Sequence, residues 1–293
     1  RVYVVGGHIT PFVGKGAPGF KKGQRGLKDY ISEAVTGAFK STGVSASAID
    51  RVYVGNFAGE LFNSQGHLGA AVAAADDNLR HKPSMRVEAA CASGGLACSE
   101  AARAIIAGDD CVLAVGVEVQ TEVDARTGGG YLARAADFRR QSNIDAFTFP
   151  ALFARRVKAY LDRYPEASMD DIASVAAKAY ANGNRNPLAH MQSVALSESK
   201  ARQGAEFLSN PDYRPFLRLT DCSQVSDGGA AVVFMSAEGL RRHGIDLSDA
   251  VEVLAFDQGA GDIWSDPDEL AELTNVKTVV RRMLAKVGVR PSD

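Results

Sequence analysis

Met85-Arg-Val-Glu-Ala-Ala-Cys91-Ala-Ser-Gly-Gly-Leu-Ala-Cys98 is the most informative stretch of the chain. It predicts a short strand over 85–87, a turn of small residues, and a helix from Ala92 to about Ile106. Cys91 then lies at the N-terminus of this helix, where backbone N–H groups without helical partners favour negative charge. Because the thiolate is the reactive form of cysteine, this position is typical of a nucleophile that forms a thioester.

Two interpretations of Cys91 remain open on this spacing. Free cysteines are often buried as small apolar side chains, and Cys91 packed beneath the helix would fit that role. The field of a helix N-terminus is worth roughly 0.3–2 kcal/mol, which does not by itself ionise a thiol at neutral pH. A nucleophile at this position therefore needs a base or a cation as well.

The composition is that of an ordinary globular protein. The 293 residues are 46% hydrophobic and 23% charged, which is enough for one large domain or two. A net charge of −2 gives no general reason to expect nucleic acid or an anionic membrane as partner. There is no run of 18 apolar residues and no signal-peptide pattern, so no membrane span is expected.

The cysteines predict neither a metal site nor a disulfide framework. No two of them form a C-x-x-C pair, and this points to a reducing, intracellular setting. The four are Cys91, Cys98, Cys111 and Cys222. Cys98 and Cys111 are expected in the core, Cys98 on the helix and Cys111 in a strand over 111–119.

The first part of the chain predicts an α/β layered fold. A buried strand is expected at 2–5, a helix with one apolar face at 27–39, and a second strand at 51–55. Gly14-Lys-Gly-Ala-Pro-Gly19 matches G-x-G-x-x-G, but it lacks the strand before it and the helix after it. A loop is therefore predicted there instead of a dinucleotide site.

Residues 121–215 differ from their surroundings in having helix-like segments rich in alanine and in cations. They predict an inserted, mainly helical subdomain, followed by a strand over 230–236. The cations are either solvated helix faces or the holder of a phosphate-bearing ligand. They are Arg155, Arg156, Lys158, Arg163, Lys178, Arg185, Lys200 and Arg202.

The first strand–helix unit has a counterpart late in the chain. A strand is predicted at 251–256, and a helix with one apolar face at 276–287. Gly288-Val289 ends this helix as Gly43-Val44 ends the first one, which indicates either an internal repeat or the general frequency of glycine caps. In a true repeat the second copy would stop at Asp293 before its second strand, so the chain is expected to be cut short.

Two motifs resemble the thiolase superfamily. Val87-Glu-Ala-Ala-Cys91-Ala-Ser-Gly-Gly-Leu-Ala is similar to its first cysteine motif, and Ser226-Asp-Gly-Gly-Ala-Ala231 with Met235-Ser236 to its Asp-Gly-Ala-Ala segment. Val54–Gly59 and Val115–Glu118 are similar to its intervening strands. Within the superfamily, the sequence most resembles the sterol-carrier-protein-type thiolases and acetyl-CoA acetyltransferases.

The resemblance implies a layered α/β/α/β/α fold built from a duplicated βα unit, with the second half incomplete. Residues 1–120 would form the N-terminal half with the nucleophile, and 121–215 the inserted loop domain. Residues 216–250 would end the N-terminal half, and 251–293 would begin the C-terminal half.

The resemblance also implies acyl transfer at coenzyme A thioesters, either 3-ketoacyl-CoA cleavage or acetyl-CoA condensation, with Cys91 as nucleophile. Coenzyme A and acyl-CoA would be substrates, with no tightly bound cofactor, and the phosphates would meet the cationic loop domain. A homodimer or a dimer of dimers is implied. The cytoplasm is the default location, and a peroxisome the alternative, because a peroxisomal signal stands at a C-terminus.

Other family motifs are missing from this chain. The Gly-His-Pro histidine, the Asn-Glu or His-Asp motif and the second cysteine belong to the family's second half, and His190 is expected to be only a surface or loop contact. The chain alone is therefore expected not to turn over acyl-CoA. Two alternatives stay open: a ketoacyl synthase fed by acyl carrier protein, and a non-catalytic subunit that binds acyl-CoA or scaffolds a partner enzyme.

Overall fold

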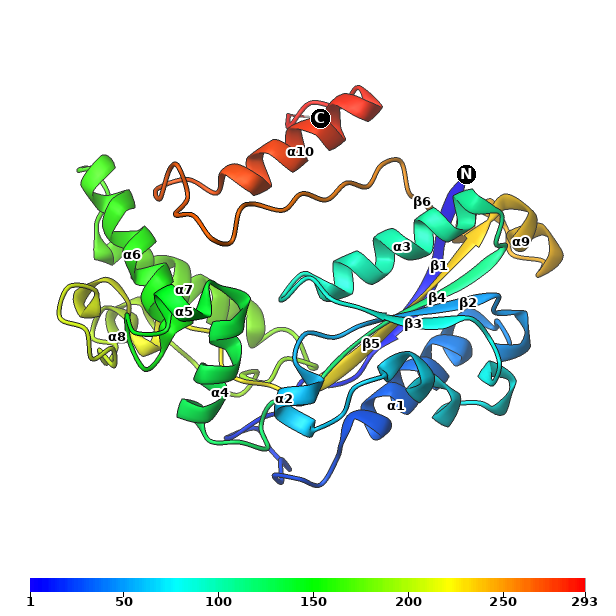
Figure 1. The fold of residues 1–293 in the computed structure, drawn as a ribbon, viewed down its shortest axis with the longest axis horizontal. Coiled ribbons are helices and arrows are strands. Elements are labelled where there is room, and N and C mark those ends of the chain that lie inside the picture. The colour runs from blue at the N-terminus through cyan, green and yellow to red at the C-terminus, as the bar shows by residue number, and fades with distance from the viewer. Residues whose placement is uncertain (293) are drawn as a thin grey trace.

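A six-stranded mixed sheet with helices on both faces forms the centre of the molecule (Figure 1). The computed structural model describes residues 1–292. The strand order is β3-β2-β4-β5-β1-β6, with β2 parallel to β3 and β4 and the other neighbours antiparallel. The strands are β1 (Val2–Ile9), β2 (Arg51–Gly55), β3 (Ser84–Val87), β4 (Cys111–Glu118), β5 (Gly228–Ser236) and β6 (Val251–Glu252). The predicted α/β class is confirmed.

Two long helices cover opposite faces of this sheet. Helix α1 (Leu27–Thr42) packs on one face and α3 (Ser93–Ala107) on the other. Side chains alternate along β4, so that Leu113 belongs to the core under α1, while Val112 packs with Ala101 of α3. The outer side of α3 is not covered in the same way, and Ile106 is exposed there.

The two helix ends that suggested a repeat have the same geometry. Gly43 ends α1 with φ of 71°, and Gly288 ends α10 (Thr274–Val287) with φ of 68°. Both glycines adopt the left-handed conformation, which costs other residues more. Helix α10 lies above α3 in Figure 1, and none of its residues is buried.

The strand predicted at 251–256 is much shorter than expected. β6 contains only Val251 and Glu252, which pair with Val4 and Tyr3 of β1. The backbone N–H of Val253 still donates to the carbonyl of Val2 (2.9 Å). The prediction was wrong beyond Glu252, because a β-branched and apolar composition favours a strand only where a neighbouring strand is available.

The segment 121–215 is mainly helical, as predicted, and its helices gather beside one end of the sheet (Figure 1). They are α4 (Ala125–Leu132), α5 (Phe138–Gln141), α6 (Thr148–Arg163), α7 (Met169–Gly183) and α8 (Glu198–Arg202). Ala151 and Leu208 belong to a small separate core in this region. The domain boundaries stay a prediction.

Short elements complete the fold. The remaining helices are α2 (Gly59–Asn63) and α9 (Ala237–Arg242), with 3₁₀ turns at Ala46–Ala48, Leu68–Ala74, Asp77–Leu79, Ala133–Ala135, Arg214–Phe216, Leu219–Asp221 and Leu247–Asp249. None of the helices within residues 1–292 combines the length and the apolar character that crossing a bilayer requires.

The crossing segment, residues 253–273, leads from β6 towards α6 before α10 begins (Figure 1). Arginines of α6 hold it. Arg156 donates to the carbonyls of Leu270 (3.0 Å) and Glu272 (3.2 Å), and Arg163 pairs with the carboxylate of Glu269 (2.8 Å). These two cations therefore bind another part of the chain and are not merely solvated.

Candidate active site

Cys91 lies in the turn between β3 and α3, immediately before the N-cap residue Ala92. The helix begins at Ser93, one residue later than expected. The thiol is exposed, so the alternative in which Cys91 is packed beneath the helix is wrong. The role of Cys91 as nucleophile stays a prediction.

The other three cysteines are in different environments. Burial raises the pKa of the Cys98 thiol, the pKa of Cys111 to about 12 and that of Cys222 to about 11. The core position of Cys111 is confirmed, and Cys98 packs against the core under α3. All four are free thiols, and Cys91 is the exposed one.

The backbone on the N-terminal side of Cys91 is unusual. Ala90 has φ of +48°, in the left-handed region that costs a residue with a Cβ roughly 1–2 kcal/mol. The hydroxyl of Ser93 accepts a hydrogen bond from the N–H of Ala89 (3.0 Å) and donates to the carbonyl of Ala90 (2.6 Å). The carboxylate of Glu88 accepts from the N–H of Ala90. Sequence reasoning missed these contacts, and only the hydroxyl two residues after the cysteine could have suggested them.

Glycines on two strands let α3 begin close to the sheet. A Cβ built on Gly55 of β2 would lie 2.4 Å from the carbonyl oxygen of Ser93 and 2.8 Å from the nitrogen of Gly94. A Cβ built on Gly116 of β4 would lie 3.9 Å from the Cα of Gly94. The end of β2 therefore sets where the helix starts, and with it the turn that carries Cys91.

The space beside the start of α3 is open. Apart from its chain neighbours and the backbone of its own helix, a Cβ added to Gly94 or to Gly95 would meet no heavy atom of residues 1–292 within 4 Å. The backbone N–H groups of these two glycines have no acceptor in the part of the chain that the structure describes. Exposed donors at a helix N-terminus favour a negative charge next to them, such as a thiolate or a carbonyl oxygen that gains charge.

Asp227, in the second motif, has a buried carboxylate that holds two parts of the chain together. It is 3% exposed, and its carboxylate accepts hydrogen bonds from the backbone N–H groups of Gln120 (2.7 Å) and Thr121 (3.0 Å) and from the Thr121 hydroxyl (2.6 Å). It therefore fixes the chain after β4 to the start of β5.

His190 is a loop contact, as expected, and it is buried. Its Nε2 donates to the carbonyl of Lys15 (3.2 Å), and its Nδ1 shares a hydrogen bond with the Ser226 hydroxyl (2.8 Å). A Cβ on Gly14 would lie 2.5 Å from the ring. Both ring nitrogens are thus occupied away from Cys91. The segment predicted as a loop at 14–19 has no helix or strand, and His190 packs against its start.

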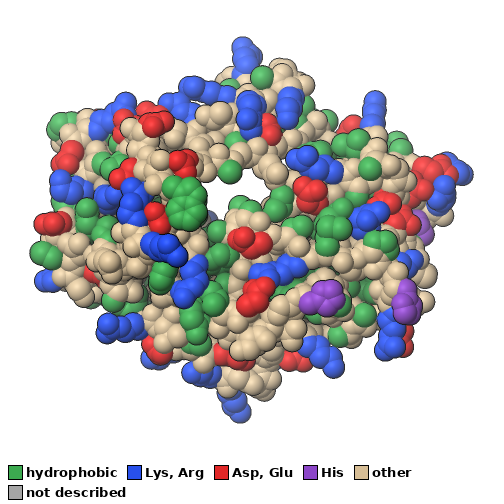
Figure 2. All heavy atoms as spheres, viewed as in Figure 1, with side chains coloured by type: hydrophobic (Ala, Val, Ile, Leu, Met, Phe, Trp, Pro, Cys, Tyr) green, Lys and Arg blue, Asp and Glu red, His purple; other side chains and the backbone are tan. Residues whose placement is uncertain are grey.

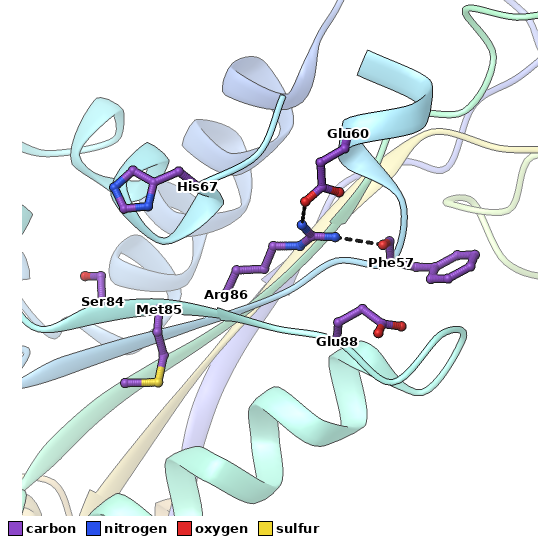
Figure 3. A pocket seen from close by; sticks show the side chains of 7 residues that line it. All are labelled: Phe57, Glu60, His67, Ser84, Met85, Arg86 and Glu88. Atoms are coloured by element: carbon purple, nitrogen blue, oxygen red, sulfur yellow. Dashed lines mark hydrogen bonds and ion pairs between the residues drawn. The ribbon is translucent and has the colours of Figure 1, made fainter. Parts of the chain in front are cut away.

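An open pocket of about 640 Å³ adjoins the strand before the Cys91 turn (Figure 3). Arg86 lies in it, bonded to the carboxylate of Glu60 and to the carbonyls of Phe57 (2.7 Å) and Asn56 (3.1 Å). Glu88 belongs to the lining, but Cys91 does not. The Arg86 guanidinium is therefore already paired and is not free to bind a phosphate.

A second pocket, of about 580 Å³, lies between α3, the start of the crossing segment and α10. Arg103 and Ile106 of α3 line it, and the Arg103 guanidinium stacks 5.4 Å from the ring centre of Phe256. Figure 2 shows an opening that passes through the molecule in the same view, below α10 as drawn in Figure 1. The outer side of α3 is therefore accessible.

The cations of the helical segment divide into two groups. Arg155, like Arg156 and Arg163, pairs with the crossing segment, at Asp266 (3.1 Å). Lys158 pairs with Asp162 (3.1 Å), and Arg202 pairs with two carboxylates. Lys178, Arg185 and Lys200 have no ion pair within residues 1–292. Phosphate binding in this region stays a prediction.

Proteins with similar sequences include acetyl-CoA acetyltransferases and sterol carrier protein 2. It is 31% identical over 269 residues to an acetyl-CoA acetyltransferase of Methanothermobacter thermautotrophicus, which covers 91% of this chain and 66% of the relative. It is 25% identical over 307 residues to sterol carrier protein 2 of Rattus norvegicus, covering all of this chain and 52% of the relative. The chain thus spans less than two thirds of the length of these relatives.

Solved structures share the fold. The Ltp2-ChsH2(DUF35) aldolase superposes with a TM-score of 0.73 at 20% identity, over all of this chain and 71% of that one. The Acat5 thiolase from Ascaris suum in complex with coenzyme A gives a TM-score of 0.64 at 18% identity, over 84% and 68%. The model of the thiolase N-terminal domain matches residues 2–207. With the exposed cysteine turn and the mixed sheet already described, this match shows that the chain belongs to the thiolase family.

Proposed function

We propose that this chain carries the acyl-accepting nucleophile of a coenzyme A-dependent acyltransferase, and that Cys91 is that nucleophile. The observation that carries the proposal is the exposed Cys91 at the start of α3, next to open space and to backbone N–H groups that have no acceptor among residues 1–292. The similarity to acetyl-CoA acetyltransferases supports coenzyme A thioesters as substrates.

The proposed step moves an acyl group between two sulfur atoms. The Cys91 thiolate attacks the carbonyl carbon of the acyl thioester, and the bond between that carbon and the coenzyme A sulfur breaks. The acyl group is then held on Cys91 as a thioester, while coenzyme A leaves as a thiolate and takes up a proton. The absence of side chains around Gly94 and Gly95 leaves room for the carbonyl to approach.

The helical segment supplies the proposed contact for the ligand's phosphates. Lys178, Arg185 and Lys200 are the cations there that no carboxylate of the described chain neutralises. Lysine and arginine bind phosphate through charge-assisted hydrogen bonds. Cleavage of 3-ketoacyl-CoA and condensation of acetyl-CoA are both consistent with this assignment, and a homodimer or a dimer of dimers is the proposed assembly.

Mass spectrometry after mixing with an acyl donor tests the proposal. The full-length polypeptide that carries this sequence is incubated with acetyl-CoA, and Cys91 is expected to gain one acetyl group. Cys91→Ala should abolish this modification without changing the unfolding midpoint, because the side chain is exposed. Acetylation from acyl carrier protein only would favour a ketoacyl synthase, and an unmodified Cys91 with both donors would favour a non-catalytic subunit.

A further inference from the structure

We propose that Ser93 is a positioning residue for Cys91, because its hydroxyl holds the backbone turn that fixes where the thiol lies. This inference rests on the proposed function of Cys91 as acyl acceptor. It assigns no contact between Ser93 and the substrate. The hydroxyl acts on the backbone of Ala89 and Ala90, and Cys91 follows directly.

The hydroxyl closes the turn around the cysteine. It accepts from the N–H of Ala89 (3.0 Å) and donates to the carbonyl of Ala90 (2.6 Å), so a residue on the helix side of Cys91 binds two groups on the strand side. Two backbone bonds span the same turn, from the N–H of Ala92 to the carbonyl of Ala89 (2.9 Å) and from the N–H of Ser93 to that of Ala90 (3.1 Å). The peptide groups preceding Cys91 are thereby fixed.

Ser93 is itself immobilised, as a positioning residue must be. Ser93 is only 4% exposed. Its carbonyl lies against Gly55 of β2, where no side chain could fit. The hydroxyl thus transmits the position of the sheet to the turn. Ser99, farther along the same helix, bonds only the carbonyl of Gly95 within the helix (3.1 Å) and provides a matched control.

The left-handed conformation of Ala90 explains why the turn needs these bonds. The φ of +48° is unfavourable for a residue with a Cβ and persists only where the surroundings enforce it. Ser93 holds the Ala90 carbonyl and Glu88 holds its N–H, so both peptide groups are bonded to side chains. Without the hydroxyl, Ala90 can relax to a commoner conformation, which would swing Cys91 away from its present direction.

The experiment compares two reactions of the same thiol in Ser93→Ala, Ser93→Thr and Ser99→Ala. Acetylation of Cys91 by acetyl-CoA requires an oriented thiol, whereas alkylation by iodoacetamide requires mainly exposure. Ser93→Ala is expected to slow acetylation about tenfold or more while alkylation changes less than about threefold. Ser93→Thr keeps the hydroxyl and should recover most of the rate, and Ser99→Ala should match the wild type.

Two further measurements separate the possible failures. Amide hydrogen exchange at Ala89 should accelerate in Ser93→Ala, and Glu88→Ala, an exposed change, should also slow acetylation more than alkylation. Acetylation at the wild-type rate in Ser93→Ala, an equal fall in both reactions, or unchanged exchange at Ala89 would each overturn the positioning role. A wild-type protein that is not acetylated at all would instead refute the proposed function, and the positioning role with it.

Discussion

Replacing Gly55 by alanine should destabilise the protein and misplace the proposed nucleophile at the same time. The new Cβ would lie 2.4 Å from the carbonyl oxygen and 2.6 Å from the carbonyl carbon of Ser93. Ordinary contacts begin at about 3.5 Å, so the start of α3 must retreat by about 1 Å. Crowding of this kind costs about 1–3 kcal/mol of unfolding free energy, and a 1 Å misplacement can cost about a hundredfold in rate.

Urea unfolding and Cys91 acetylation measure the two effects of Gly55→Ala separately. Gly95→Ala is the stability control, because its Cβ meets no atom within 4 Å and alanine favours the helix by about 0.4–1 kcal/mol. Gly95→Ala should keep or raise the unfolding midpoint, although it narrows the approach to the thiol. An unchanged midpoint and an unchanged acetylation rate in Gly55→Ala would refute the view that β2 sets the position of the turn.

Four further outcomes follow from the described contacts. Iodoacetamide at pH 8 should modify Cys91 in the native protein and all four cysteines after unfolding, because Cys91 is the exposed thiol. Asp227→Ala should cost about 1–3 kcal/mol, measured by urea unfolding, because two part-buried backbone N–H groups lose their acceptor. Burial raises the pKa of Glu118 above its ordinary 4.5, so the stability it contributes is present below that value and is lost as pH rises through the folded pKa. Glu118→Gln does not titrate and should therefore gain stability relative to wild type as pH rises above 4.5 towards the folded pKa of Glu118. Arg156→Ala should increase hydrogen exchange in 266–273, because two carbonyls of that segment lose their donor.

Each of these outcomes has a clear contradiction. Modification of Cys222 at the same rate as Cys91 would contradict the greater exposure of Cys91. An unfolding midpoint in Asp227→Ala equal to that of the wild type would contradict the structural role of the Asp227 carboxylate. A stability difference between Glu118→Gln and wild type that does not change with pH would show that Glu118 has an ordinary pKa. Lys158→Ala, which removes a pair within α6, is the control for Arg156→Ala and should leave exchange in 266–273 unchanged.

Local sequence patterns predicted most of the fold. Apolar periodicity located the helices that became α1, α3 and α10, and β-branched runs located the central strands, because those residues meet a sheet or a core where the pattern expects one. The prediction of a strand over 251–256 was wrong beyond Glu252, because β1 pairs only with Val251 and Glu252. The local sequence pattern could not show where this pairing ends. Pairing partners depend on the whole chain.

The candidate site was predictable in its position but not in its support. The strand, small residues and helix around Cys91 placed the thiol correctly to within one residue of the helix start. The left-handed conformation of Ala90 could not be predicted from the sequence, because alanine rarely adopts it. The contact of His190 with Lys15 joins residues 175 positions apart, and local patterns carry no information about such a contact.

The place of β1 in the sheet has a consequence for how the nascent chain folds. This strand begins at Val2, yet its partners are β5, which ends at Ser236, and β6. At about 5–20 residues per second, a ribosome needs on the order of ten to fifty seconds to deliver those partners. During that interval β1 is synthesised but unpaired, and an unpaired apolar strand can pair with other chains and aggregate. Production of this protein should therefore respond strongly to chaperones that shield unpaired segments during translation.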